Sequence, residues 1–182
     1  MATTISFATA GSGGYSTYNG ANANADDGVS TLSMISTGTD VVWTTFSSLS
    51  IPSGATINGI EIIGEGSSNS FGNNCDWKVY NGSSWSSNKT PNAHWGKGTT
   101  TTDPYVGGSS DLWGLSWNAT TAAAIQIQID LSTQTAGRVI FFDYIKVRIT
   151  YTAASGYGHT VNGVAAANIS KVNGIATASI SK

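Results

Sequence analysis

The residues best suited to ligand chemistry are aromatic side chains set in a polar stretch. Trp85, His94 and Trp95 lie within NGSSWSSNKTPNAHWGKG, where most neighbours are small and polar. Trp faces stack on sugar rings while nearby amide and carboxyl groups bond the hydroxyls, the usual makeup of a pocket with few polar anchors. Aromatic residues are also enriched at subunit interfaces. The stretch therefore predicts either glycan contacts or an interface.

The acidic residues do not form a convincing catalytic pair. Glu61 and Glu65 fall on one face of a predicted strand, about 13 Å apart. That separation is too large for a retaining glycosidase and unfavourable for an inverting one, so both are expected to face solvent. Asp26 and Asp27 in NANADDGV are weak calcium candidates, because the EF-hand spacing is absent and a turn ahead of Gly28 accounts for them.

Other signatures of catalysis, metal binding and redox chemistry are absent from the sequence. It has no GxSxG, P-loop or GxGxxG motif. Cys75 is the single cysteine, so no intrachain disulfide forms, and no Cys/His spacing suits zinc. We expect Cys75 to be small and buried, and Asp143, between Phe142 and Tyr144, to be a buried, hydrogen-bonded structural group. The sequence predicts a protein that is not an enzyme and has no cofactor.

Low charge argues against two classes of partner. Asp, Glu, Lys and Arg make up 10% of the residues, the net charge is −2 and the eight basic residues are scattered, whereas phosphate binding needs clustered Lys and Arg. No run of about 18 apolar residues occurs that would span a bilayer. The start, MATTISFATAGSGG, lacks the basic and apolar regions of a secretion signal. We expect neither a nucleic-acid nor a membrane partner.

Strands rather than helices must position these residues. AIQIQIDL (124–131), FFDYIKVRITYT (141–152), INGIEIIGEG and CDWKVYNG alternate apolar and polar residues, which indicates half-buried strands. GVSTLSMIST and TDVVWTTFS predict two more, separated by a turn at Gly38, and the best helix candidate, TTAAAI (120–125), is short. Turn clusters about every 8–12 residues favour an all-β fold, an antiparallel β-sandwich of jelly-roll type. Its core is expected to contain Trp43, Trp77, Trp113 and Trp117.

The last 22 residues repeat themselves. VNGVAAANISK is followed by VNGIATASISK, two units of 11 residues that agree at 8 positions. Asn173-Gly174 is a strong hairpin signal that pairs Val172 with Ile175 and Lys171 with Ala176. The small apolar side chains then share one face: Ala167, Ile169, Ala176, Ala178 and Ile180.

This apolar face predicts a docking contact. Because an isolated two-stranded hairpin is marginal in water, we expect it to dock on its own domain, on another copy or on another protein, with a flexible tail as the alternative. The predicted organisation is a β-sandwich at 1–152, a linker at 153–160 and an assembly tail at 161–182.

Several stretches carry a family resemblance. NADDGV, LSIPSGATINGIEI, SSDLWGLSW and FFDYIKVRITYT occur in that order and resemble the jelly-roll-type β-sandwich domain of phage and prophage virion structural proteins. The tail resembles the ISKVNG repeats of predicted phage structural proteins. The resemblance implies a non-enzymatic virion-surface protein made in the host cytoplasm, preferably a capsid decoration or head-fibre protein. Its partners would be other copies, with a trimer expected, and capsid or tail proteins.

Two other functions stay open on the sequence. A carbohydrate-binding adhesin module would use Trp85 and Trp95 to stack on surface glycans. A self-assembling extracellular filament would use the tail as a strand donated to the next subunit. A glycan array tests the first function, and electron microscopy of the purified protein tests the second.

Overall fold

Strands dominate the residues that the computed structural model describes, which are 1–13, 15–17, 32–35, 41–46, 49–69, 75–93, 97, 104–130, 139–154, 171–172 and 175–176. In chain order the elements are β1 (Ala2–Gly13), β2 (Tyr15–Thr17), β3 (Leu32–Ile35), β4 (Val41–Phe46), β5 (Thr56–Ser68), β6 (Asp76–Tyr80), β7 (Tyr105–Gly107), α1 (Ala119–Ala123), β8 (Gln126–Asp130), β9 (Val139–Thr152), β10 (Lys171–Val172) and β11 (Ile175–Ala176). Every pairing between two of these strands is antiparallel.

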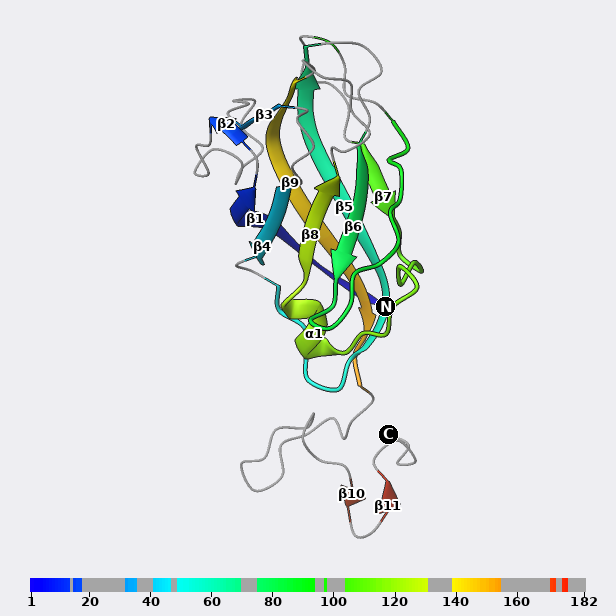
Figure 1. Cartoon of the computed structure of the whole chain (residues 1–182). Coiled ribbons are helices and arrows are strands. Elements are labelled where there is room, and N and C mark those ends of the chain that lie inside the picture. The colour runs from blue at the N-terminus through cyan, green and yellow to red at the C-terminus, as the bar shows by residue number, and fades with distance from the viewer. Residues whose placement is uncertain are drawn as a thin grey trace.

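The strands form two layers (Figure 1). The front sheet contains β6, β8, β4 and the second half of β1, and the back sheet contains β7, β5, β9, the first half of β1, and β3 with β2. Residues 85–90 run antiparallel to β6, where Trp77 and Lys89 exchange two backbone hydrogen bonds of 2.8 Å. From β4 to β9 the named strands alternate between front and back, as in a jelly roll. The predicted all-β antiparallel sandwich is confirmed.

β1 joins the two sheets, and the sequence patterns did not predict it. Residues 2–7 pair with β9 in the back sheet, and residues 8–13 pair with β4 in the front sheet. The register shifts between Ala8 and Gly11 mark bulges, which bend a strand and let it pass from one sheet to the other. ATAGSG, the second half of this strand, carries small residues at every position, so it gives no alternating signal.

The two strands predicted around Gly38 exist as β3 and β4, but they do not pair with each other. β3 lies beside β9 in the back sheet, whereas β4 lies between β1 and β8 in the front sheet. The chain therefore crosses from one layer to the other between these strands.

The core lies between the sheets and follows the predicted alternation. Trp77 and Val79 of β6 are fully buried, and they face the other layer together with Ile127 and Ile129 of β8. The back sheet adds the inward residues of β5 and β9, which are Ile60, Ile62, Ile145, Val147 and Ile149. The predicted core positions of the tryptophans hold for Trp77 and Trp113, and Trp117 packs against the core while partly buried. The side chain of Trp43 lies outside the described residues.

Some side chains depart from the burial that alternation predicts. Gln128 and Thr150 occupy outer-face positions but are buried, and each lies on a strand with a neighbour on both sides. Tyr151, expected inward, is only partly buried near the end of β9. Glu61, expected in solvent, forms an ion pair with Arg148 of the adjacent strand, with 2.7 Å between Oε2 and Nη1.

Asp143 is fully buried, as predicted, and it lies at a β-bulge. Along β5, Glu65 pairs with Tyr144 and the next residue, Gly66, pairs with Phe142, so Asp143 is the extra residue on β9. A bulge interrupts the alternation of faces, which explains why residues 142–144 are all buried. A Cβ on Gly66 would stand 2.2 Å from a backbone carbonyl oxygen of β9, so the bulge requires glycine there.

The predicted short helix is α1, one turn that leads into β8. Asn118 caps it: its side chain accepts the Thr121 N–H at 2.9 Å, and the Thr121 hydroxyl accepts the Asn118 N–H at 3.0 Å. This reciprocal arrangement satisfies two backbone donors at the start of the helix.

The C-terminal hairpin has the predicted register. β10 and β11 form a separate two-stranded sheet (Figure 1) in which Lys171 pairs with Ala176 and Val172 pairs with Ile175. The other predicted tail residues lie outside the described residues: Ala167, Ile169, Asn173, Gly174 and Ile180.

Candidate functional site

Trp85 begins the extended segment 85–90 beside β6, and a turn places it there. The Oδ1 atom of Asn81 accepts hydrogen bonds from the N–H groups of Ser83 and Ser84 at 3.0 and 2.9 Å. The Asn81 N–H in turn donates to the Ser84 carbonyl at 3.2 Å. An asparagine side chain that mimics a backbone turn in this way reverses the chain locally, so that Trp85 returns beside the strand that has just ended.

The indole of Trp85 lies against two neighbours on β6. Its ring centroid is 5.1 Å from that of Tyr80, with the planes 36° apart, and the Lys78 Nζ lies 5.4 Å from the indole centroid. Residues two apart on a strand point to the same face, so Lys78 and Tyr80 support the ring from the outer face of the front sheet. Trp85 nevertheless remains 37% exposed.

Polar side chains share this outer face. The cross-strand pairs of β6 and β8 there are Asp76 with Asp130, Lys78 with Gln128, and Tyr80 with Gln126. Two side chains of segment 85–90 bond the two carboxylates. Asn88 Nδ2 donates to Asp130 Oδ2 at 2.9 Å, and Thr90 Oγ1 donates to Asp76 Oδ1 at 2.7 Å. We call the following set the front-face site: Asp76, Lys78, Tyr80, Trp85, Gln126 and Asp130.

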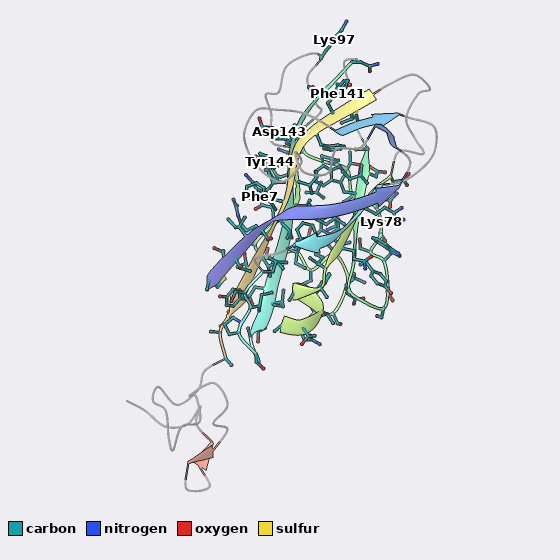
Figure 2. All side chains as sticks on the ribbon, turned by 90° about the vertical axis from the view of Figure 1, so that its left-hand side faces the viewer. Phe7, Lys78, Lys97, Phe141, Asp143 and Tyr144 are labelled. Atoms are coloured by element: carbon teal, nitrogen blue, oxygen red, sulfur yellow. The ribbon has the colours of Figure 1, made fainter. Side chains whose placement is uncertain are left out.

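The opposite face of the sandwich uses its aromatic residues differently. Figure 2 shows Lys78 on one side of the molecule and Phe7 and Tyr144 on the other. Phe7 and Tyr144 make an edge-to-face contact at 5.4 Å, and Lys146 Nζ bonds the Tyr144 hydroxyl at 2.9 Å. Tyr144 is 1% exposed, so its ring is occupied by neighbours, whereas the Trp85 ring is accessible.

An ion pair anchors segment 85–90 to the back sheet. Lys89 pairs with Asp111 and lies 4.8 Å from the Trp113 ring centroid. The Trp113 indole N–H donates to the Ile60 carbonyl of β5 at 2.9 Å. Partial burial opposes ionisation of Asp111, but the hydrogen bonds from Lys89 and the Trp113 N–H, with the Lys89 charge, hold its pKa below the ordinary value. The ionised carboxylate therefore ties together the edges of the two sheets.

Cys75 has no place in a reactive site. It is 1% exposed, and burial raises the pKa of its thiol well above the ordinary value. The neighbouring Trp77 side chain acts in the opposite direction, and the charges of Asp76 and Asp130 add to the increase. The group is a protonated thiol at neutral pH, which matches the predicted structural role.

The structure locates part of the predicted site. Trp85 is described, whereas His94, Trp95 and the calcium candidates Asp26 and Asp27 lie outside the described residues. Within the described ranges, no group of three or more His, Cys, Asp and Glu side chains is arranged to hold a metal ion. The same ranges contain no helix long and apolar enough to cross a bilayer.

Sequence reasoning did not bring together the residues that share the outer face with Trp85. Alternation had already put Asp76 and Lys78 on the outer face of their strand, and Asp130 on the outer face of another. What no pattern indicated was that β6 and β8 are adjacent and pair Asp76 with Asp130. The short turn after Tyr80, with Asn81-Gly82 at its start, was the one available signal that Trp85 returns to this face.

Comparison with known proteins gives little beyond the geometry. No protein-family model and no curated protein matches the chain. Among solved structures, the chain is similar to the crystal structure of the CBM36-1 domain of a multidomain xylanase from the hindgut metagenome of Trinervitermes trinervoides. The identity is 12% and the TM-score 0.43, over 80% of this chain and 96% of that one. The strand pairing described above defines the sandwich independently of this likeness.

Proposed function

We propose that this protein is a non-enzymatic carbohydrate-binding module that uses the front-face site. The observation that carries the proposal is the Trp85 indole, which is 37% exposed although it is held against Tyr80 and Lys78. A large ring kept in a fixed place and left open to solvent is suited to stack on a flat apolar partner.

The surroundings of Trp85 supply the polar half of sugar recognition. Gln126 offers both donors and acceptors, and the carboxylates of Asp76 and Asp130 accept hydrogen bonds from hydroxyl groups. Asn88 and Thr90 hold those carboxylates in position, so binding a ligand orders few additional side chains and loses less entropy.

The arrangement of the carboxylates favours binding over hydrolysis. A glycosidase places its two carboxyl groups on either side of the scissile bond. Asp76 and Asp130 are direct cross-strand partners, so their side chains project side by side from one sheet face. Such a pair is better arranged to accept two hydroxyl groups than to act on a bond between them.

The test is a glycan array followed by calorimetry on any glycan retained. Trp85→Ala should weaken binding at least about tenfold, as expected for an aromatic residue that dominates an interface. Tyr105→Ala is the matched control, since it removes a ring that is 45% exposed on β7 of the back sheet, and it should bind like the unaltered protein. Trp95→Ala asks whether the second predicted ring contributes.

Two results would count against the proposal. One is the absence of any glycan signal from the unaltered protein at high concentration. The other is equal loss of binding in Trp85→Ala and Tyr105→Ala, because a site on the front sheet has no reason to depend on Tyr105.

A second candidate function is assembly on a virion surface, which is compatible with glycan binding by the exposed sandwich. The supporting observation is the separate β10–β11 hairpin, with Val172 opposite Ile175. A two-stranded hairpin is marginal alone, and its strands carry few of the charges that usually protect an edge from pairing. Together with the sequence resemblance, this supports a capsid decoration or head-fibre protein whose tail contacts other copies or the particle, with a trimer expected.

Deletion of residues 161–182 tests this second function. The sandwich should keep its circular dichroism spectrum and urea midpoint, because its core lies within the first 152 residues, whereas oligomer mass and occupancy on particles should fall. Unchanged mass and occupancy would show that the tail has no assembly role.

A further inference from the structure

The front-face site is elongated. Trp85 contacts Tyr80 at one end of β6, and Asp76 lies at the other end beside Asp130. Four residue steps separate Tyr80 from Asp76, which is about 13 Å along a strand. A single pyranose ring is shorter than this span, so a ligand that covers the site from Tyr80 to the Asp76–Asp130 pair needs more than one sugar.

The two ends differ in chemistry. The aromatic end consists of Trp85 and Tyr80, with Lys78 beside the indole at 5.4 Å. The other end carries the Asp76–Asp130 pair, so the charged side chains that the β6–β8 pairing brings to this face are two carboxylates and one ammonium. The named residues of the front-face site therefore carry one more negative than positive charge, and both negative charges lie at the end away from the indole.

The carboxylate end distinguishes neutral from acidic ligands. A carboxylate offers about four acceptor positions, and Thr90 occupies one of those of Asp76, so Asp76 keeps capacity for sugar hydroxyls. Asn88 holds the Asp130 carboxylate beside it. A carboxylated sugar in the same place has no proton to donate at neutral pH and meets two like charges. Charges of one sign about 4 Å apart repel measurably even in water.

From this geometry we infer, building on the glycan-binding function proposed above, that the ligand is an uncharged oligosaccharide lying along β6. One sugar ring stacks on Trp85, and hydroxyls of a more distant ring donate to Asp76 and Asp130. Monosaccharides and uronate-containing glycans are disfavoured, the first because they reach one end of the site and the second because of charge.

The experiment uses the full chain and a matched set of probes on one array. The probes are mono- and tetrasaccharides of glucose, galactose, mannose and N-acetylglucosamine, with hexuronate counterparts of the hexose tetrasaccharides. A neutral tetrasaccharide should bind at least about tenfold more tightly than its monosaccharide. Its uronate counterpart should bind roughly five- to thirtyfold more weakly at 10 mM salt, and the difference should shrink at 150 mM salt as screening increases.

The double variant Asp76→Asn with Asp130→Asn assigns the effect to its residues. Asparagine keeps the side-chain size and an acceptor oxygen for Asn88 and Thr90, and the urea midpoint checks that the fold is kept. The gap between neutral and uronate probes should close in this variant. Lys78→Gln is the opposite control, because removing the Lys78 ammonium should widen the gap.

The outcomes separate this inference from the function on which it rests. If glycans bind through Trp85 but uronates bind as tightly as neutral sugars, or the double variant leaves the gap unchanged, the inference is overturned and the glycan-binding function stands. Equal binding of monosaccharides and tetrasaccharides overturns the extended pose in the same way. If no probe binds, both fail together.

Discussion

At Trp113, replacement by glycine should destabilise the protein less than replacement by alanine. At an ordinary core position the glycine variant is the less stable of the two. The Trp113 side chain is 3% exposed, its indole N–H bonds the Ile60 carbonyl at 2.9 Å, and its ring lies 4.8 Å from the Lys89 ammonium. Its backbone, however, has a φ of 58°, in the left-handed region. Residues with a Cβ are strained there by roughly 1–2 kcal/mol.

The magnitudes follow from these contacts. Trp113→Ala removes a large buried ring and should lower the free energy of unfolding by about 3–5 kcal/mol. Trp113→Gly removes the same ring but also relieves the strain, whereas its extra freedom in the unfolded chain costs only about 0.4–1 kcal/mol. The glycine variant should therefore be the more stable of the two, by about 0.5–1 kcal/mol.

Urea unfolding followed by far-ultraviolet circular dichroism measures the difference. The control is the same pair of substitutions at Trp77, which is fully buried in β6, where glycine should be the less stable by about 0.5–1 kcal/mol. Trp113→Phe, which keeps a ring but loses the N–H donor, gives a milder reference. If Trp113→Gly unfolds at lower urea than Trp113→Ala, the left-handed backbone does not contribute to stability as argued.

Three further outcomes are expected. The lowered pKa of Asp111 means that its ion pair with Lys89 stabilises the fold above the unfolded-state pKa of about 3.9 and is lost as pH falls through the lower folded-state value. Asp111→Asn should remove the contribution of this ion pair to the loss of unfolding free energy at acid pH. That contribution should be less than about 1 kcal/mol, because both side chains are about a third exposed. A chromogenic thiol reagent at pH 8 should label Cys75 only in denaturant, and rapid labelling of the native protein would contradict its burial. Gly107→Ala should lower the free energy of unfolding by about 2–4 kcal/mol, because φ is 85° and a Cβ would stand 2.2 Å from a carbonyl oxygen of β5. Gly108→Ala is the control: a Cβ there has nothing within 4 Å, so the change should cost less than about 1 kcal/mol. Equal urea midpoints for the two variants would refute the steric reasoning.

Alternating apolar and polar residues predicted the strands that have one face on the core and the other on the outer surface. Ile127 and Ile129 alternate with polar residues because one face of β8 packs on the core and the other faces outward. The Asn-Gly turn predicted the pairing of Val172 with Ile175 for a similarly local reason, since turn geometry fixes the register of a hairpin. Burial at sheet centres was less predictable, as Gln128 and Thr150 show, because it depends on side chains of neighbouring strands that lie far away in the sequence.

The sequence by itself determined an all-β chain of low charge, a core built on alternating isoleucine and valine, a buried Cys75 and the pairing of residues 171–172 with 175–176. These follow from periodicity and turn chemistry, which act over a few neighbouring residues. Only the tertiary structure decided that β1 bridges the two sheets, that β6 lies beside β8, and that Trp85 therefore shares one outer face with Asp76 and Asp130. Strand order is set by packing and hydrogen bonding between segments distant in the chain, and no local pattern in the residues themselves records which strands become neighbours.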